Sequence, residues 1–474
     1  MKIFLFFLFA LFPTCLFAQM ELNLRQCRKM ALQSSKEMDI AGQQQRKAVY
    51  DLKAYRADYL PKVSATALGL YSRKKYDYTI NGGYLPTYKP GENGSLEPNV
   101  VVDPTTQQPV TGVDGKPVFN LYAFLPDIRL QLNLRGVYTG GVQLEQPIYM
   151  GGKVRAAVGM AKVGENIADG NVRLSRSEVL FETDAAYWQA LRVDEQVVAA
   201  AKYREVVLEL WKSLKNSESV GMATMNDVLK AQVRCNEAGL MLQKAQNGRR
   251  LARMNLCRLI GLNLQTELCL QDSLTETLDA KIWMLDSAVS QRADYSMLVD
   301  EVALKGRQIA LTRSDFLPQV GVTAGYSYSG GLKLNGKEDV GTTFSAMAAV
   351  HIPVFHWGEG RNKVRSARME EEISRLKMEK SKDLMQLEIA SNRFSLKDAV
   401  TRVEMAGNAL LQAKENLNIT TNQYKVGMEN LTALLDAQAQ WQQAWSEWVD
   451  AKALLHLSES AYLKAIGKLE LLSD

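Results

Sequence analysis

Few residues in this chain have types and spacing that could do chemistry. Its 474 residues include only three histidines, His351, His356 and His456, which lie scattered in the second half. The cysteines form no Cys-x-x-Cys pair and have no histidine nearby, so no metal site is predicted, although a disulfide between Cys257 and Cys269 is left open. No nucleophile motif such as Gly-x-Ser-x-Gly occurs. The sequence therefore disfavours an enzyme and predicts no catalytic residue and no cofactor.

The more informative residues belong to a sequence motif that occurs twice. SVGMATMNDVLKAQ occupies positions 219–232, and KVGMENLTALLDAQ occupies positions 425–438. Both copies place Val-Gly-Met directly before a stretch of helix-forming residues, 206 positions apart. Glycine adopts the left-handed conformation that ends a helix at little energetic cost. Each copy thus predicts a reversal between two helices, centred on Gly221 and on Gly427.

The duplication extends well beyond these turns. LKAYRADYLPKVSATALGLYS at 52–72 matches IALTRSDFLPQVGVTAGYSYS at 309–329. The segments that begin at Pro147 and Pro353 also match, and the offset from there onward stays at 206. Each half therefore reads as a helix, a Leu-Pro step, a strand, a loop, a strand, a proline, a very long helix, the Val-Gly turn and a further helix.

The order of segments predicts the domain organisation. The first 18 residues, MKIFLFFLFALFPTCLFA, have the pattern of a cleaved secretory signal. A first repeat is expected at 19–262, an equatorial linker at 263–280 and a second repeat at 281–474. The first repeat carries an insertion rich in Pro, Gly, Asn and Asp at 76–127, which predicts a long surface loop.

Two short stretches in the second half alternate between apolar and polar residues. In VGVTAGYSYS, which begins at Val320, the two kinds of side chain would point to opposite faces of a strand, and FSAMAAVHI, from Phe344, alternates likewise. About ten such residues with aromatic ends fit a tilted strand that crosses a bilayer, although a half-buried strand in a soluble sheet has the same pattern. No run of eighteen apolar residues follows Gln19, so no transmembrane helix is predicted.

The segments between strands and turns predict exceptionally long helices. From 151 to about 217, and again from about 361 to 426, helix formers dominate and proline is absent. Roughly 65 residues at about 1.5 Å each would form a rod near 100 Å long. The helices after the turns keep a seven-residue apolar period, as at Leu434, Trp441 and Trp448, which indicates coiled-coil-like packing. We interpret the tryptophans as a packing seam rather than a ligand site.

Two complete copies of this order resemble the TolC-like outer membrane efflux proteins, the outer membrane factors of tripartite efflux and secretion systems. The Leu-Pro strand entries and the phrase VGMATMNDVLKAQ carry the resemblance, which covers nearly all of the chain after the signal segment. The family fold is mainly α-helical with a membrane β-barrel. It implies four strands per chain, a twelve-stranded barrel closed by three chains, and long helical hairpins that form a trimeric tunnel through the periplasm. Four strands cannot close alone, so a homotrimer removes the open edges.

The resemblance also assigns a role to the two turns. In this family they form the periplasmic tip, which meets the helical hairpins of an adaptor protein. Apolar residues flank both glycines, and apolar side chains at an exposed tip suit docking better than a plain turn. The expected docking residues are Val220, Gly221, Met222, Val426, Gly427 and Met428.

Further residues match positions with known roles in the family. An aspartate six residues beyond the first tip glycine bonds a tyrosine three residues before the second, and Asp227 and Tyr424 hold these positions. The family's arginine two residues beyond the second glycine is replaced by Glu429, so this part of the latch is absent or rebuilt with Lys425 or Lys230.

Two tunnel-lining aspartates constrict the channel in well-known members of the family. The matching positions here are Ala433 and Asp436, so only one ring of carboxylates could remain. Three Asp436 side chains around a threefold axis would attract cations. The alternative is that Asp436 is an ordinary solvated surface residue.

Three functions remain as interpretations of the sequence. The first is a passive duct in the outer membrane for small molecules (drugs, toxic compounds or metal ions), supplied by a periplasmic adaptor and an inner-membrane pump of RND or ABC type. The second is the same duct serving type I protein secretion. The third is a periplasmic coiled-coil structural protein without a pore, which would stay soluble without detergent. The small net charge of +5 gives no reason to expect a nucleic-acid partner.

Overall fold

The computed structural model describes residues 20–274, 282, 285 and 287–472. The expected signal segment 1–18 and part of the expected linker 263–280 lie outside these ranges, as do the last two residues of the C-terminal tail. Within the described ranges, every helix is too short or too polar to span a membrane. The chain divides into two compact units, one built around a sheet and one built from helices.

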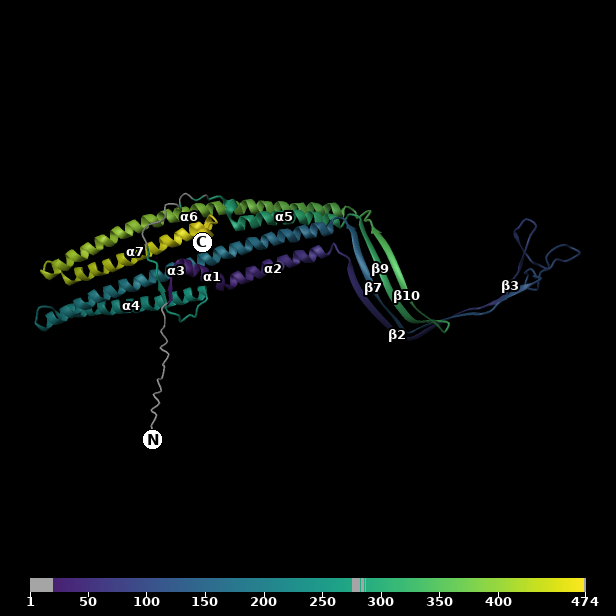
Figure 1. Ribbon diagram of the computed structural model, residues 1–474, viewed down its shortest axis with the longest axis horizontal. Coiled ribbons are helices and arrows are strands. Elements are labelled where there is room, and N and C mark those ends of the chain that lie inside the picture. The colour runs from purple at the N-terminus through teal and green to yellow at the C-terminus, as the bar shows by residue number, and fades with distance from the viewer. Residues whose placement is uncertain (1–19, 275–281, 283–284, 286, 473–474) are drawn as a thin grey trace, which may run out of the picture. The chain divides into compact units, whose positions relative to one another are not determined.

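The sheet unit consists of residues 56–154 and 314–356. Its four antiparallel strands are β2 (Lys62–Ile80), β7 (Ile128–Met150), β9 (Gln319–Leu334) and β10 (Lys337–His351), in the order β10-β9-β7-β2 (Figure 1). These strands are 15 to 23 residues long, so the expected length of about ten was too short. The ladder continues past the apolar alternation because its main-chain hydrogen bonds do not depend on apolar side chains.

The strand register gives the sheet one apolar and one polar face. Residues paired directly across neighbouring strands point to the same face. One row across the four strands is apolar and consists of Ala65, Val142, Tyr326 and Phe344. The adjacent row, on the opposite face, consists of Thr66, Gly141, Ser327 and Thr343. The alternation expected in the second half is therefore confirmed, and the first half continues it.

The long insertion between β2 and β7 is partly ordered into small strands. Strand β3 (Gly83–Pro86) pairs with β6 (Tyr122–Leu125), and β4 (Tyr88–Pro90) pairs with β5 (Leu96–Pro98). Strand β2 runs to Ile80, so the loop begins about five residues later than the expected position 76. Proline and glycine content indicated a loop correctly but did not indicate these short hairpins.

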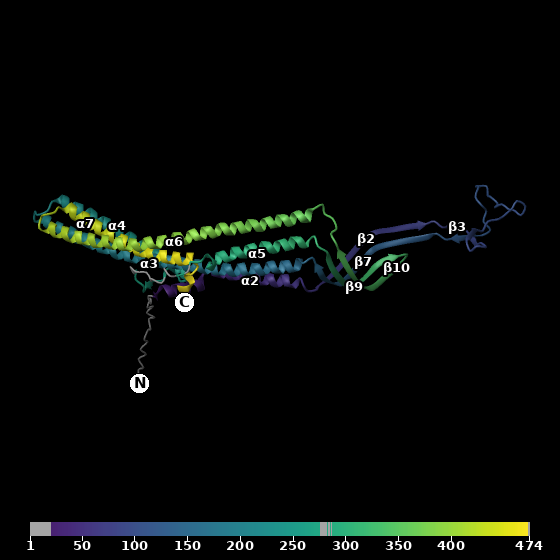
Figure 2. The same ribbon diagram turned by 90° about the horizontal axis from the view of Figure 1, so that it is seen from above.

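The helical unit contains the rest of the described chain. Its helices are α1 (Leu24–Ser34), α2 (Lys36–Ala57), α3 (Lys153–Ser219), α4 (Met225–Ile260), α5 (Ala293–Ser314), α6 (Glu359–Lys425) and α7 (Leu431–Ala465). Helices α3 and α6 have 67 residues each, which confirms the prediction of two very long helices. Helices α2 and α5 end just before Pro61 and Pro318, as the Leu-Pro steps predicted. In Figures 1 and 2 the hairpins α3/α4 and α6/α7 lie side by side.

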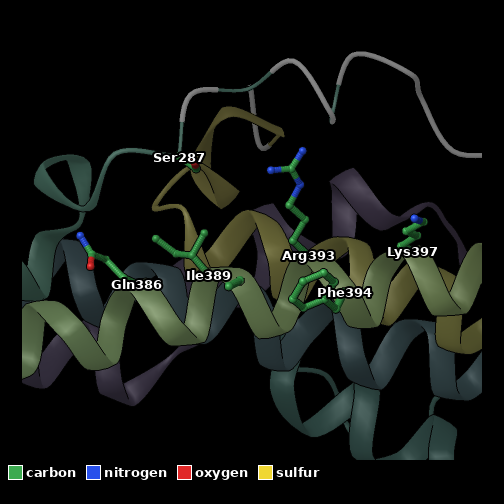
Figure 3. A pocket seen from close by; sticks show the side chains of 7 residues that line it. Ser287, Gln386, Ile389, Arg393, Phe394 and Lys397 are labelled. Atoms are coloured by element: carbon green, nitrogen blue, oxygen red, sulfur yellow. The ribbon is translucent and has the colours of Figure 1, made fainter.

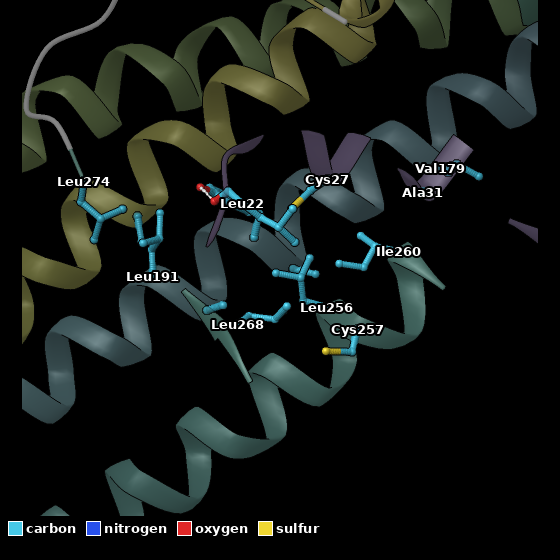
Figure 4. Close-up of a cluster of buried hydrophobic side chains, with 14 of the residues drawn as sticks. Leu22, Cys27, Ala31, Val179, Leu191, Leu256, Cys257, Ile260, Leu268 and Leu274 are labelled. Atoms are coloured by element: carbon cyan, nitrogen blue, oxygen red, sulfur yellow. Dashed lines mark hydrogen bonds between the residues drawn. The ribbon is translucent and has the colours of Figure 1, made fainter. Parts of the chain in front are cut away.

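Short elements surround the middle of the helical unit. Strand β1 (Met20–Leu22) pairs in parallel with β8 (Leu268–Leu270), and the 3-10 turns η2 (Val289–Gln291) and η3 (Leu469–Leu472) complete the set. A core of buried side chains gathers where β1, α1 and β8 meet α3 and α4 (Figure 4). Leu22, Cys27, Leu256 and Leu268 are among its members. These contacts join segments separated by more than 200 positions.

A buried ion pair ties α1 and α7 to α3. The Arg28 guanidinium donates from Nε and Nη2 to the two carboxylate oxygens of Asp184, both at 2.6 Å. The Ser460 hydroxyl donates to the same carboxylate at 2.8 Å. All three residues are buried. A buried ion pair is stable only when the other hydrogen-bonding positions of its charged groups also have partners, because burial removes water. Ser460 supplies one such partner to the Asp184 carboxylate.

The seven-residue apolar pattern of α7 marks the side chains that pack between helices, as predicted. Leu434, Leu455 and Tyr462 are buried, and Trp445 and Trp448 pack against the core. Trp441 and Trp445 contact each other, with ring centroids 5.3 Å apart. The tryptophan stripe is therefore a packing seam.

Candidate functional site

The two Val-Gly-Met turns have the same main-chain geometry. Gly221 and Gly427 have φ angles of +78° and +77°, in the left-handed region that favours glycine. At the first turn the N–H of Met222 donates to the carbonyl of Ser217 at 2.8 Å, and the N–H of Gly221 donates to Glu218 at 2.9 Å. The bonds from Met428 to Gln423 and from Gly427 to Tyr424 repeat this pattern. Both helices therefore end in a Schellman motif.

A capping residue starts the next helix at each turn. Thr224 accepts from the N–H of Asp227 at 3.1 Å, and Asn430 accepts from the N–H of Ala433 at 2.9 Å. Both caps lie three residues beyond the tip glycine. The sequence analysis did not single them out, although Thr or Asn directly before a stretch of helix-forming residues is a recognised start signal for a helix. Together, the Schellman motif and the cap define each reversal within a few residues.

Buried side chains hold the two turns together. Leu214 at the end of α3 and Val228 and Ala231 at the start of α4 pack with Leu431 and Leu435 of α7. Half-buried side chains, including Trp211 and Tyr424, cover this cluster. The two tips are therefore one packed assembly rather than two independent loops.

The side chains next to the glycines point to solvent. Met222 and Met428 are 84% and 78% exposed, and Val220 and Val426 are 67% and 70% exposed. The apolar residue after a Schellman glycine usually packs back onto its helix, but neither methionine does so here. The tip thus presents four flexible or branched apolar side chains on two hydrogen-bonded turns.

The residues matched to the family's latch lie close together without the expected bond. The Asp227 carboxylate accepts a hydrogen bond from the Thr224 hydroxyl at 2.7 Å. Burial raises the pKa of the Tyr424 hydroxyl, and the negative charge of Asp227 raises it further, so this hydroxyl stays a neutral donor. Among the described side chains, no hydrogen bond joins Asp227 to Tyr424. The Glu429 carboxylate accepts from the N–H of Asn430 at 3.3 Å.

The remaining candidates occupy separate positions. Asp436 is exposed on α7, one turn beyond the capped start of that helix. His456 is buried and stacks on Trp188 with ring centroids 4.1 Å apart, whereas His351 ends strand β10. No group of three His, Cys, Asp or Glu residues in the described part of the chain could hold a metal ion.

The cysteines of the described chain are free thiols. The disulfide left open between Cys257 and Cys269 is not formed. Burial raises the pKa of the Cys27 thiol to about 12, with smaller contributions from Asp272 and Cys257. This thiol therefore stays protonated and acts as a small core side chain.

A family model described as outer membrane efflux protein matches residues 117–262 and 284–468. The chain belongs to the outer membrane efflux protein family. The matched ranges include both tip turns and the four long helices around them. The protein is thus an outer membrane exit duct of an efflux or secretion system, with its tunnel in the periplasm.

Individual relatives are distant in sequence. The outer membrane efflux protein BepC of Brucella suis is 21% identical over 331 residues, which cover 70% of this chain and 72% of BepC. Nodulation protein T of Rhizobium leguminosarum is 25% identical over 198 residues, or 40% of this chain and 42% of that protein.

Solved structures show the same fold at low identity. The CmeC outer membrane channel of Campylobacter jejuni has a TM-score of 0.70 at 17% identity and covers 94% of this chain and 86% of its own. VceC of Vibrio cholerae has a TM-score of 0.70 at 16% identity, with 94% and 96% covered. The combination of long helices and a four-stranded sheet was thus predicted correctly from the sequence.

Proposed function

We propose that three copies of this outer membrane efflux protein form a passive duct for small molecules. The open edges of the sheet support the trimer. Among the described strands, β2 and β10 each have only one neighbour in this sheet, and four strands from each of three copies would close a twelve-stranded sheet. The two-faced sheet supports this arrangement, because it would place Tyr326 and Phe344 toward lipid and Ser327 toward the lumen.

The observation that carries the proposed coupling to a pump is the pair of exposed tips. Four apolar side chains, Val220, Met222, Val426 and Met428, project from two matching turns. Exposed apolar groups of this kind mark protein–protein contacts, and methionine adapts its shape to a partner. We infer that the tips receive the helical hairpins of a periplasmic adaptor, which links the duct to an inner-membrane pump of RND or ABC type.

The tip also holds the proposed means of closure. Tyr424 packs against the buried cluster, its hydroxyl lies within the electrostatic influence of Asp227, and Glu429 replaces the arginine expected from the family resemblance. We propose that Asp227 and Tyr424 restrain the closed tip through this packing. Asp436 is exposed, and three copies of it would form a ring that favours cations.

Substitution of both tip methionines tests the docking proposal. In cells of the native host, Met222→Asp/Met428→Asp is expected to raise the accumulation of ethidium several-fold, toward the level of a deletion strain. A carboxylate buried against an apolar partner would lack compensation. The protein should still reach the outer membrane in normal amount, which immunoblotting of membrane fractions checks.

The matched control keeps the tip apolar. Met222→Leu/Met428→Leu should export ethidium as the wild type does, since these substitutions conserve volume and polarity. Normal export by the double aspartate variant would refute docking through these side chains.

A further inference from the structure

Two hollows on the described surface are each lined by two basic residues. One, of about 680 Å³, lies along α6 in the helical unit, and its lining includes Arg393, Phe394 and Lys397 (Figure 3). That lining comes mostly from a single helix. The other, of about 150 Å³, lies in the sheet unit and is lined by Lys75 of β2, Lys333 of β9 and residues of β7. We call the second one the sheet hollow; three strands bring its residues together.

Hydrogen bonds and an ion pair fix the walls of the sheet hollow. The N–H of Gln131 donates to Oδ1 of Asn335 at 2.7 Å, and the N–H of Asn335 donates to the carbonyl of Gln131 at 2.9 Å. Nζ of Lys333 lies 3.3 Å from the carboxylate of Glu338, which also accepts from the N–H of Gly331 at 2.9 Å. The turn between β9 and β10 is therefore attached to β7, and the lysine before it is held in place.

Both lysines belong to the apolar face of the sheet, the one that carries Phe344. Strand β10 alternates regularly from Phe344 to Glu338, six positions away, so these two side chains point to the same face. Lys333 pairs with Glu338, and residues paired directly across strands share a face. Lys75 joins this row through position 133 of β7, which pairs with both lysines.

A glycine bulge in β9 brings Lys333 to this face. Between two successive pairs of the ladder, β9 advances from 329 to 332 while β10 advances only from 341 to 339. The extra residue lies at Gly331, whose φ angle is +82°, and a left-handed glycine is typical of such a bulge. Alternation from Tyr326 without a bulge would have placed Leu334 on the apolar face and Lys333 on the polar one. The bulge exchanges them.

The sheet hollow lies just beyond a band of uncharged side chains. From 63 to 69 on β2 and from 144 to 138 on β7, the residues of the apolar face carry no charge. Tyr138 and Tyr328, with ring centroids 6.0 Å apart, lie near the end of this band, and the lysines follow. Tyrosines of membrane sheets gather where hydrocarbon meets headgroups. In the orientation of the proposed function, the hollow thus lies at the level of the lipid headgroups on the exterior side.

The residues of the sheet hollow suit a phosphorylated sugar. Lysine ammonium groups bind phosphate through charge-assisted hydrogen bonds. Lys75 has no ion-pair partner among the described side chains, so its charge is available to a ligand. Asp77 also lines the hollow, and its carboxylate repels phosphate but accepts hydrogen bonds from hydroxyl groups. The combination therefore favours a phosphate attached to a sugar over a free phosphate ion.

We propose that the sheet hollow binds the phosphate-bearing sugar headgroup of a glycolipid in the outer leaflet of the outer membrane. Lys75 and Lys333 hold the phosphate, and Asp77 and Gln131 bind hydroxyl groups of the sugar beside it. The proposal rests on the orientation of the sheet in the proposed function, with the apolar face toward lipid. It adds a specific lipid ligand to the duct.

Titration of the detergent-solubilised protein with bisphosphorylated lipid A, followed by native mass spectrometry, tests the site. Wild type is expected to bind one lipid A per chain. In Lys75→Gln/Lys333→Gln the affinity should fall about tenfold or more, because both cations that attract the phosphate are lost. Lys75→Arg/Lys333→Arg should bind as tightly as wild type, since guanidinium groups also bind phosphate. Heat-modifiable mobility on SDS gels confirms that each variant is folded.

A matched control removes the same charge elsewhere. Lys89 and Lys116 are exposed in the insertion between β2 and β7 and lie outside the sheet hollow. Lys89→Gln/Lys116→Gln should bind lipid A as wild type does. An equal loss of affinity in this control would reduce the effect to general charge attraction and overturn the site.

Two further ligands identify the source of the phosphate. Lipid A without its phosphates should bind to wild type about tenfold more weakly than the bisphosphorylated form. Inorganic phosphate in large excess should leave bound lipid A in place. Equal binding of the two lipids would overturn phosphate recognition, and displacement by inorganic phosphate would assign the hollow to a free anion and overturn the lipid site.

The outcomes separate this inference from the proposed function. Wild type that carries single-channel current, but binds lipid A no better than Lys75→Gln/Lys333→Gln, overturns the lipid site and leaves the duct intact. Wild type that carries no current and stays soluble without detergent overturns the duct, and with it the orientation on which the lipid site depends.

Discussion

Asp184→Ala is expected to lower the free energy of unfolding by about 3–5 kcal/mol, because it leaves the Arg28 guanidinium buried without its carboxylate. Asp184 is fully buried and accepts hydrogen bonds from Arg28 and Ser460. Removing it also removes one polar contact that α1 and α7 each make with α3. Urea unfolding of the detergent-solubilised protein, followed by tryptophan fluorescence, measures the change.

Two further variants make the test of Asp184 specific. Glu178→Ala breaks the exposed pair with Lys464 on the same two helices, and a change of only about 0–1 kcal/mol is expected. The double replacement Arg28→Met/Asp184→Leu removes both charges and should recover most of the loss. Equal losses of unfolding free energy in Asp184→Ala and Glu178→Ala would contradict the claim that burial makes the Asp184 pair the more important of the two.

Gly331→Ala should destabilise the sheet unit far more than the same change at a neighbouring glycine. Gly331 has φ +82°, and a Cβ atom there would overlap the carbonyl oxygen of Gly136 in β7. Gly336 has φ +79°, but no atom lies within 4 Å of a Cβ built on it. Both variants carry left-handed strain of about 1–2 kcal/mol, but only Gly331→Ala forces two strands apart.

The expected outcome is a loss of correctly assembled protein. Gly331→Ala should abolish or strongly reduce the folded form in outer membrane fractions, whereas Gly336→Ala should remain close to wild type and shift its unfolding midpoint slightly. Heat-modifiable mobility on SDS gels separates folded from unfolded protein. Similar yields of folded protein from the two variants would show that the close approach of the strands at Gly331 does not limit folding.

Local and periodic features of this fold could be predicted from the sequence. Gly221 and Gly427 indicated left-handed main chain, and the proline-free stretches of helix-forming residues indicated long helices; both are present. The alternation from Val320 onward fixed which residues share a face of β9, and the register with β10 confirms it.

Long-range polar contacts could not be predicted in this way. Arg28 and Asp184 are separated by 156 positions, and neither lies in a distinctive motif, so only the packed helices bring them together. The bond between Asp227 and Tyr424 stays a prediction, and the structure adds a contact that the sequence analysis did not foresee, because the Thr224 hydroxyl donates to the Asp227 carboxylate at the start of α4. The strand lengths were underestimated because apolar alternation does not report main-chain pairing.

The central claim is that this protein forms a channel that conducts ions and small solutes. Single-channel current in a planar bilayer tests this claim most directly. Purified wild type should give small, flickering currents, and Asp227→Ala/Tyr424→Phe should give larger, steadier ones because the tip is released. Asp436→Asn should keep the conductance and lower the preference for cations. No current from any of the three, with protein that stays soluble without detergent, would contradict the duct and favour a coiled-coil structural protein.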